Sequence, residues 1–525
     1  MCLVKMKGII EMSFTENMRN ELLENYNESV TENGAVGYRT TGKYLLDINF
    51  AVASLRSATE QEIIESFKKA FFEDKVLAVK WLFFARDVRG GLGERRLFRT
   101  AMKFIAEYEP ETAAKVIPLV AEYGRFDDMW EFLDNETLRP VVLNYIDSQL
   151  KNDIDDKNNQ KPISLLAKWL PSVNSSSDRT KVYANIIRKH LGMTERDYRK
   201  LLAELRMYLD VVERKMSAKQ WGDIKYEAVP SCANLIYNNA FMRNDGERRQ
   251  EYLSKLEKGE TKIHASVLYP HDIVHRYKQY NYGMGRYSLK QYDQALEALW
   301  KALPDMVQGN GDTIVVADGS GSMGIRIRNT GVTALDVANA LAIYFAERSS
   351  GGFKNKYITF SSRPQLVNLD TGKTLRDKIS IAIAHNEIAN TNVEAVFDLV
   401  LSTAIQNKMT QNDIPANVLI ISDMEFDTAV CSYCSSRGID ANLFNVIKQK
   451  YAQAGYKLPR LVFWNVNSRT GTVPVRQNKL GVALVSGFSV NICNMVMSGE
   501  LDPYKCLLDT INSERYKPVE DLLIA

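Results

Sequence analysis

From about residue 15 to residue 302, apolar side chains recur at the spacing of α-helices. Ile63, Phe67 and Phe71 are four residues apart and so lie on one side of a helix. The same periodicity predicts four short helices between 92 and 150 and longer ones at 178–192, 194–213, 231–243, 245–258 and 288–302. Successive helix pairs of this kind are typical of stacked hairpins. We therefore expect residues 1–310 to form a HEAT-like helical-repeat domain, either a solenoid or a ring.

The pattern changes after Pro304, where short β-branched runs alternate with amphipathic segments. The runs lie at 312–318, 355–360, 416–423, 460–466 and 481–487. Continuous Val, Ile and Leu runs indicate strands buried on both faces, as in a parallel sheet between two layers of helices. We expect a doubly wound, Rossmann-like α/β domain over 311–500. A C-terminal helix within 501–525 is expected to pack back on the helical domain.

Composition excludes several classes of protein. The 525 residues are 45% hydrophobic and 25% charged, which is typical of a globular chain, and no run approaches the roughly 20 apolar residues that cross a bilayer. A net charge of +3 does not by itself indicate a nucleic-acid partner. Six cysteines are too few for a disulfide framework, so we expect a reducing, cytoplasmic setting. Met1 and Met12 both remain possible translation starts.

Oxygen-bearing side chains follow the predicted strands. Asp318, Ser320 and Ser322 come directly after the first strand, Asp423 ends the third, and Thr391 precedes a helix. Ligands of open α/β sheets gather at the carboxyl ends of the strands, and carboxylate and hydroxyl oxygens suit a small hard cation such as Mg²⁺. A turn rich in glycine and serine is also a common helix cap, and this alternative stays open for the first three residues alone. No lysine follows the glycines, so a phosphate-binding P-loop is not supported.

These five residues resemble the metal-ion-dependent adhesion site of von Willebrand factor A domains, and the resemblance covers about residues 311–500. It implies that Ser320, Ser322 and Thr391 bind Mg²⁺, or another divalent cation, directly or nearly so. It also implies that Asp318 and Asp423 act directly or through water. The remaining coordination position would then accept water or an acidic group of a protein partner.

A broader resemblance spans nearly the whole chain. RDVRGGLGERR (86–96), YGRFDDMW (123–130), SDMEFD and FWNV are similar to segments of the Ro/TROVE group. SCANLIYNNAF (231–241) and LVSGFS (484–489) are similar to an uncharacterised Ro-like branch known as a domain of unknown function. In the Ro autoantigen, stacked helical repeats close into a ring through the A domain and bind small noncoding and misfolded RNA. The resemblance implies a ribonucleoprotein component of this kind.

Two basic segments support an RNA-binding surface independently. The 86–99 segment contains five arginines against two acids, and the 157–215 segment contains thirteen Lys and Arg against six Asp and Glu. Trp169, Tyr183 and Tyr198 lie within the second segment and are candidates either for stacking on unpaired bases or for the helical core. The expected RNA contacts are Arg86, Arg89, Arg95, Arg96, Arg99, Lys168, Arg179, Lys181, Arg188 and Lys189.

Each basic segment also has a structural alternative. Arg86 and Arg89 are candidates for ion pairs with acids such as Asp127 and Asp128, and a positive helical stretch is often only a solvated face. A further tyrosine-rich segment, 271–292, is expected to be a loop or linker that reaches the C-terminal domain. The alternatives differ in whether the basic side chains form ion pairs within the fold or remain free on its surface.

No catalytic constellation is visible in the chain. The five histidines have no partners at triad spacing, and the C-x-x-C at 431–434 lacks the second ligand pair of a zinc site. We therefore expect a non-catalytic, Ro-like scaffold for small structured or misfolded RNA, with a Mg²⁺-binding A domain and no membrane association. The alternative is a Mg²⁺-dependent protein-interaction adaptor without RNA binding. A metal-dependent hydrolase is least supported, since no general base accompanies the predicted metal ligands.

Overall fold

The computed structural model describes the chain from residue 27 to residue 525 apart from short gaps. The described residues are 27–32, 36–281, 286–307, 313–327, 330–386, 392–425, 441–474, 482–492, 495 and 502–525. Helices dominate up to residue 301, and a six-stranded sheet with its helices follows. The change of pattern at Pro304 therefore marks the boundary between an α-helical region and an α/β domain.

The helical region forms because amphipathic helices bury their apolar sides against one another. Helix α3 begins at a capping box, where the Thr59 hydroxyl accepts a hydrogen bond from the Glu62 amide. Ile63, Phe67 and Phe71 of α3 are buried as the periodicity predicts. The helices are α2 (Tyr44–Leu55), α3 (Glu60–Glu73), α4 (Lys75–Arg86), α5 (Arg95–Tyr108), α6 (Pro110–Val116), α7 (Val120–Tyr123), α8 (Leu138–Asn158), α9 (Leu166–Trp169), α10 (Asp178–His190), α11 (Glu195–Tyr208), α12 (Val212–Ser217), α13 (Ser231–Asn244), α14 (Gly246–Glu257), α15 (Pro270–Tyr277) and α16 (Gln294–Lys301).

Two antiparallel hairpins correct the expectation that this region is all helical. β1 (Glu28–Val30) pairs with β2 (Val36–Tyr38), and β3 (Lys278–Asn281) pairs with β4 (Arg286–Leu289). Each strand has three or four residues, too few for an alternating pattern to stand out in the sequence. The second hairpin falls within 271–292, so part of this expected linker is a short β-structure that follows α15.

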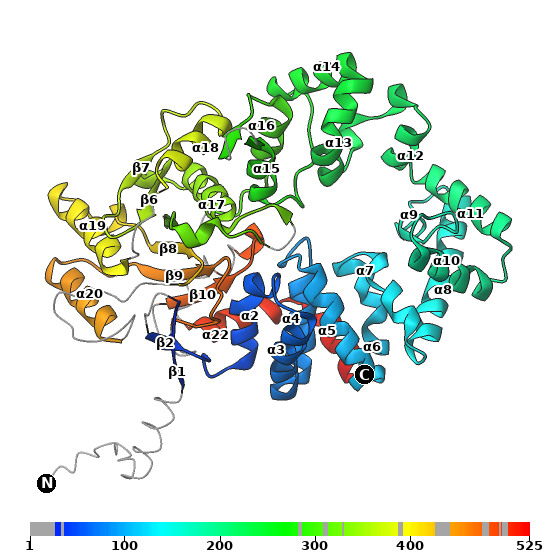
Figure 1. Ribbon diagram of the computed structural model, residues 1–525, viewed down its shortest axis with the longest axis horizontal. Coiled ribbons are helices and arrows are strands. Elements are labelled where there is room, and N and C mark those ends of the chain that lie inside the picture. Colours follow the sequence, from blue (N-terminus) through cyan, green and yellow to red (C-terminus); the bar gives the residue numbers. More distant parts are fainter. Residues whose placement is uncertain are drawn as a thin grey trace, which may run out of the picture.

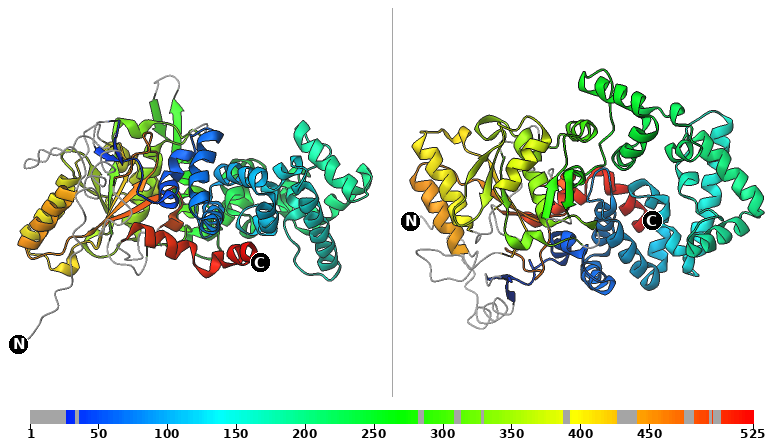
Figure 2. Two further views of the ribbon diagram at one scale, coloured as in Figure 1. Left: turned by 90° about the horizontal axis from the view of Figure 1, so that it is seen from below. Right: turned by 45° about the horizontal axis from the view of Figure 1, so that its top comes forward.

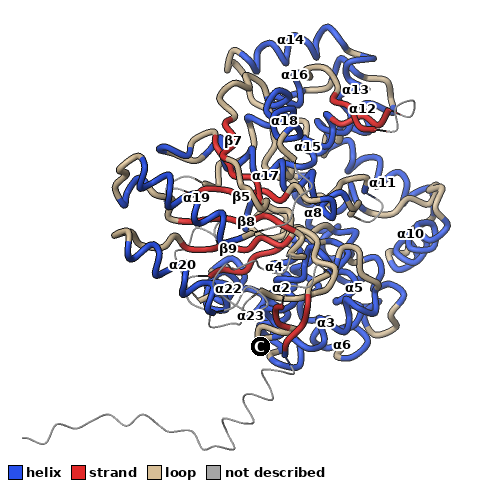
Figure 3. Tube along the Cα trace, turned by 60° about the vertical axis from the view of Figure 1, so that its left-hand side comes forward, coloured by secondary structure: helices blue, strands red, loops and turns tan. Residues whose placement is uncertain are grey.

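The α/β domain is built on one mixed sheet of strand order β10-β9-β8-β5-β6-β7 (Figure 3). Five strands are parallel, and β7 runs antiparallel to β6 at the edge, which the expected parallel sheet did not include. The elements are β5 (Thr313–Asp318), α17 (Ala334–Arg348), β6 (Lys356–Phe360), β7 (Leu366–Asn368), α18 (Leu375–Ala384), α19 (Val393–Gln406), β8 (Asn417–Ser422), α20 (Ala441–Gln453), β9 (Arg460–Asn465), β10 (Val482–Ser486), α22 (Pro503–Ile511) and α23 (Lys517–Ile524).

The strand order creates a switch point at the centre of this sheet. After β5 the chain adds β6 and β7 on one side, and then returns to place β8 on the other side of β5. All residues of β5 and β8 are buried, in keeping with their apolar sequences. In open α/β sheets the crevice beyond the carboxyl ends of such a strand pair is the usual ligand site. The side chains that follow β5 and β8 therefore lie where a ligand of this fold would bind.

The α/β domain closes the helical region into a ring of elements (Figure 1). At one end of the helical region α2 packs on β10, and at the other end α15 packs on α17. The C-terminal helices run back along the ring, where α22 and α23 pack on α4 and α23 also contacts α6 (Figure 2). The single C-terminal helix expected within 501–525 is thus a pair of helices lying on the helical region.

Aromatic and charged side chains fasten this ring closure. The Tyr269 hydroxyl, just before α15, donates to the Leu92 carbonyl at 3.0 Å, and the Arg56 guanidinium lies 3.9 Å from the centre of the Phe488 ring. The His271 ring stacks on Tyr269 and meets Phe488 edge-on. Burial lowers the pKa of His271 from 6.5 to about 4. The junction thus brings the two ends of the helical region against the loop that follows β10.

Candidate functional site

The ends of β5 and β8 bring an aspartate and a serine into direct contact. Asp318 closes β5 and is 2% exposed. The Ser422 hydroxyl, at the end of the neighbouring β8, donates to Asp318 Oδ2 at 2.6 Å. Ser422 was not among the expected site residues, because its side chain acquires a role only when β8 pairs with β5. The two strand ends therefore form the floor of a polar site at the switch point.

The turn after β5 gathers the two predicted serines. The Ser320 amide donates to Asp318 Oδ1 at 2.9 Å, which folds the turn back over the strand end. The hydroxyl oxygens of Ser320 and Ser322 are 2.9 Å apart and share a hydrogen bond. Both side chains are half-buried. The arrangement holds two hydroxyls and one carboxylate within a single short turn.

Asp423 has a buried carboxylate oxygen without a hydrogen bond among the described residues. It is 1% exposed, and its Oδ2 has no hydrogen-bond partner within the described ranges. Its pKa is raised to about 6, first by burial and then by the charge of Asp318, against the opposing effects of Ser322, the Glu425 amide and Arg469. A buried carboxylate is costly unless it is protonated or meets a cation, and Arg469, 3.6 Å from Asp423 Oδ2, supplies a positive charge without a hydrogen bond.

The donor set at the strand tips fits a small divalent cation. Four of the five expected residues, Asp318, Ser320, Ser322 and Asp423, lie at the carboxyl ends of β5 and β8. Their oxygens are the ligands that Mg²⁺ prefers. The fifth expected residue, Thr391, lies outside the described residues. Within the described part of the chain, no group of three or more His, Cys, Asp and Glu side chains offers a metal site. A cation at this edge would therefore depend on hydroxyl oxygens besides its two carboxylates.

The arginines of the 86–99 segment converge on two acids from a distant turn. Asp128 is fully buried and accepts from Arg86 Nε at 2.8 Å and from Arg99 Nε at 2.7 Å. Arg95 reaches Asp127 at 2.5 Å and Asp128 at 3.3 Å. A side chain on Gly124 would meet Asp128 and Arg86 within 3.0 Å, so only glycine fits beside this pair. The segment is a packed ion-pair network, as the structural alternative supposed for Arg86.

The remaining arginines of this segment contact backbone carbonyls. Arg89 is exposed and donates to the Glu122 carbonyl at 2.7 Å, and Arg96 donates to the Leu55 carbonyl at 3.3 Å. Arg86 is only 2% exposed. Because such a side chain offers no surface to a ligand, Arg86 is removed from the expected RNA contacts. The other four arginines hold structural contacts while remaining partly accessible.

The 157–215 segment has a different balance of charge. Arg179 pairs with Asp134, Lys181 with Asp178, Arg188 with Glu195 and Lys168 with Glu213, all in ion pairs with partly exposed acids. Lys189 is exposed on α10, and Arg196 and Lys200 are exposed on α11. None of these three forms an ion pair with the residues that the structure describes. In Figure 1 the two helices lie at the far side of the ring from the sheet.

The aromatic side chains of this segment belong mainly to the core. Tyr183 and Tyr198 are buried, and the Tyr198 hydroxyl donates to the Pro171 carbonyl at 3.0 Å. Trp169 is half-buried, with the Arg125 guanidinium 3.9 Å from its ring. Of the two alternatives for Tyr183 and Tyr198, the structure supports the core, because buried rings offer no face to an unpaired base. Each lies four residues before another buried residue of its helix, Ile187 after Tyr183 and Leu202 after Tyr198, which is the spacing of a buried helix face.

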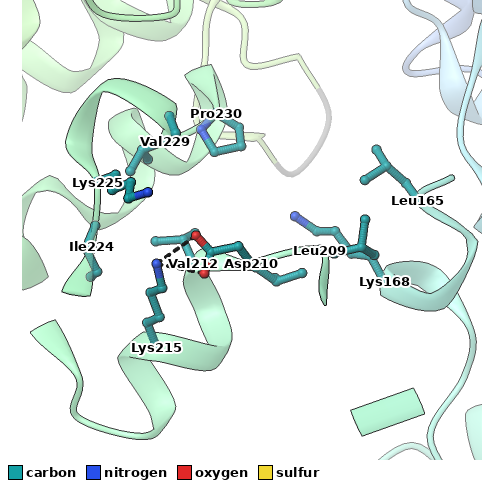
Figure 4. A pocket seen from close by; sticks show the side chains of 12 residues that line it. Leu165, Lys168, Leu209, Asp210, Val212, Lys215, Ile224, Lys225, Val229 and Pro230 are labelled. Carbon is teal, nitrogen blue, oxygen red and sulfur yellow. Dashed lines mark hydrogen bonds and ion pairs between the residues drawn. The ribbon is translucent and has the colours of Figure 1, made fainter. Parts of the chain in front are cut away.

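A shallow pocket of about 130 Å³ lies beside Lys168, between α9, α12 and the turn before α13 (Figure 4). Leu165, Val212 and Ile224 contribute to its apolar lining. Lys215 also lines it, but its ammonium group is bound by Asp210 at 2.7 Å and by the Asp223 carbonyl at 2.8 Å. The pocket therefore combines an apolar wall with cations that are already partly neutralised.

Two families described as domains of unknown function match this chain. The domain of unknown function DUF2828 matches residues 31–133 and 138–313, and the domain of unknown function DUF7788 matches residues 312–515. The two matches meet at residues 312–313, at the start of β5. "Uncharacterized protein L728" of Acanthamoeba polyphaga mimivirus is 31% identical over 533 residues, which cover 94% of this chain and 89% of that protein.

A solved structure, that of the Deinococcus radiodurans RO (RSR) protein, aligns with 87% of this chain and 93% of its own. The sequence identity is 13% and the TM-score is 0.36. No helix in the described ranges combines the length and the apolar character needed to cross a membrane.

Proposed function

This chain belongs to the family of the domain of unknown function DUF2828, and from that premise we propose that it is a non-catalytic RNA-binding scaffold whose C-terminal domain holds Mg²⁺. RNA is bound along the outer helices of the ring, and the cation lies at the tips of β5 and β8. Helices α10 and α11 lie on the far side of the ring from the sheet (Figure 1). The scaffold would thus hold RNA on one side and an acidic ligand on the other.

The RNA-binding surface is supported by exposed basic side chains that form no ion pair with the described residues. Lys189, Arg196 and Lys200 are exposed on consecutive helices and have no ion pair in the described part of the chain. Such cations gain most from a phosphate backbone, because they release its condensed counterions without first breaking an ion pair. This single observation carries the RNA-binding proposal.

The cation site is supported by the unsatisfied oxygen of Asp423. Its Oδ2 is buried without a hydrogen bond and stands with Asp318, Ser320 and Ser322 at one sheet edge. A bound Mg²⁺ would neutralise the two carboxylates and offer a coordination position to an acidic group. Asp318, Ser320, Ser322 and Asp423 would hold it, together with Thr391 as the resemblance to von Willebrand factor A domains implies.

Gel mobility shift with a structured RNA that has a single-stranded end tests the RNA-binding surface. The triple variant Lys189→Glu, Arg196→Glu, Lys200→Glu should bind roughly thirtyfold more weakly than the wild type at physiological salt. The matched control carries Lys258→Glu, Lys262→Glu and Lys457→Glu, which reverse three exposed charges elsewhere in the molecule. Equal loss in the two triples would show that net charge alone attracts the RNA.

A second candidate function is a Mg²⁺-dependent protein adaptor, which the unsatisfied Asp423 favours by itself. Its acidic protein ligand would be captured through the cation, with no contribution from RNA. A pull-down that resists ribonuclease but is lost on chelation and in Asp318→Ala would support this function. Capture that disappears with ribonuclease and survives chelation would support the RNA-binding scaffold instead.

The non-catalytic nature of the scaffold has its own test. The purified protein should leave a labelled RNA intact in the presence of Mg²⁺ over a long incubation. Cleavage of the RNA that is abolished by Ser320→Ala would contradict the proposal and assign the strand-tip site to a hydrolase.

A further inference from the structure

The loop after β9 joins the candidate cation site to the hairpin formed by β1 and β2. Glu425, which is 3% exposed, stands at the centre of this joint. Its Oε1 accepts from the Arg469 amide at 2.7 Å and the Thr470 amide at 2.9 Å, and its Oε2 accepts from the Glu32 amide at 2.8 Å. The hairpin is held a second time where the backbones of Tyr38 and Val473 pair. The hairpin is therefore fastened directly beside the tip of β8.

Within this joint, the Arg469 guanidinium stands between two carboxylates. Its Nη2 forms an ion pair with the Glu32 carboxylate and lies 3.6 Å from Asp423 Oδ2. The second distance is too long for a hydrogen bond, in agreement with the unsatisfied state of Asp423 Oδ2. Arg469 is 26% exposed and Glu32 is 57% exposed, whereas Asp423 is buried. The same guanidinium nitrogen is thus shared between an exposed acid and a buried one, and it is closer to the exposed acid.

We propose that Arg469 and Glu32 together set the affinity of the strand-tip site for a divalent cation. Arg469 competes with the cation for Asp423, and Glu32 weakens that competition by holding the guanidinium outward. This inference rests on the proposed cation site and adds its regulation. A guanidinium so close to a buried ligand repels a divalent cation strongly, because the interior screens charge less than water does.

The coupling is reciprocal. A cation at Asp423 pushes Arg469 towards Glu32 and so strengthens the docking of the β1–β2 hairpin, and a docked hairpin in turn favours the cation. The N-terminal hairpin is then an element that reports whether the strand-tip site is filled. A partner that detaches the hairpin would release Arg469 and lower the affinity for the cation.

Titration of the full chain with MnCl₂ by isothermal calorimetry tests this inference. Arg469→Gln should tighten Mn²⁺ binding about tenfold, and Glu32→Gln should weaken it about fivefold. In the double variant the effect of Glu32→Gln should vanish, since it acts only through Arg469. Lys457→Gln, which removes an exposed positive charge three residues before β9 begins, at the amino end of the strands, is the matched control and should bind as the wild type does.

Each outcome separates the cation site from its regulation. If the wild type binds Mn²⁺ and Arg469→Gln binds it with the same affinity, the inference is overturned while the proposed cation site is retained. Absence of Mn²⁺ binding in both proteins overturns both. Hydrogen exchange supplies a second readout: Mn²⁺ should slow exchange of the Tyr38 and Val473 amides in the wild type and much less in Arg469→Gln. Equal protection in the two proteins would contradict the coupling to the hairpin.

Discussion

The two basic segments of the helical region look alike in sequence and differ in the structure. In the 86–99 segment the arginines surround Asp127 and Asp128, and Asp128 is fully buried. In the 157–215 segment the acids that pair with lysine and arginine are partly exposed, and Lys189, Arg196 and Lys200 have none in the described ranges. Local net charge therefore does not reveal surface charge, because the neutralising acids can come from elsewhere in the chain.

The difference follows from where each segment lies in the ring. The 86–99 segment sits at the ring closure, where Asp87 also binds Arg515 of the C-terminal segment, so its charges are enclosed by several elements. Helices α10 and α11 lie on the far side of the ring from the sheet (Figure 1). Few of their residues are buried: Tyr183, Ala184 and Ile187 of α10 and Tyr198, Leu202 and Leu205 of α11. We infer that charge stabilises the fold in the first segment and serves binding in the second.

The strongest test of this contrast is removal of the buried acid. Asp128→Asn leaves the Arg86 guanidinium buried without a countercharge, so the free energy of unfolding should fall by roughly 3–5 kcal/mol. Urea denaturation followed by circular dichroism measures it. The control is Glu204→Gln on α11, which removes the exposed partner of Lys157. It should lower the free energy of unfolding by less than about 1 kcal/mol. Similar losses in both variants would erase the distinction between the segments.

Acid should weaken the ring closure beside the 86–99 segment. Burial lowers the pKa of His271 from 6.5 to about 4. Between these values the unfolded chain binds a proton that the folded chain does not, so the free energy of unfolding falls as pH falls, by about 3 kcal/mol at pH 4. Urea midpoints at pH 7, 6 and 5 measure this slope, and His271→Gln should flatten it. An unchanged slope in the variant would assign the acid sensitivity to other groups.

Salt dependence should distinguish the exposed cations from the paired ones. Lys189→Glu with Lys200→Glu removes two phosphate contacts and should reduce the slope of log Kd against log salt by about 1.4 units, with a roughly tenfold weaker affinity at physiological salt. Arg99→Gln should leave the slope unchanged, since its guanidinium is committed to Asp127 and Asp128. Fluorescence anisotropy at several KCl concentrations provides the slopes. A reduced slope in Arg99→Gln would place the 86–99 segment on the RNA-binding surface.

Sequence reasoning succeeds where an apolar run ends in a polar residue. Asp318 and Asp423 follow runs that are buried strands, and neighbouring parallel strands bring their ends together, so this part of the site was predictable. Ser422, Glu32 and Arg469 were not, because their roles depend on strand pairing and on a hairpin almost four hundred residues away from its partner Glu425 in the chain. The short strands of the hairpins and β7 carry too few residues for a period to be read.

The smallest effect is expected at Lys181, where the contributions of one residue to stability and to RNA affinity can be compared. Lys181 pairs with Asp178, whose side chain is 95% exposed, so Lys181→Gln should change the free energy of unfolding by at most about 0.5 kcal/mol. A weak exposed pair is readily exchanged for a phosphate, so the same variant should bind RNA about threefold more weakly. Arg99→Gln should do the reverse, lowering stability while leaving RNA affinity intact. If Lys181→Gln lost more stability than affinity, charge would serve the fold in both segments, and the contrast between them would be one of degree.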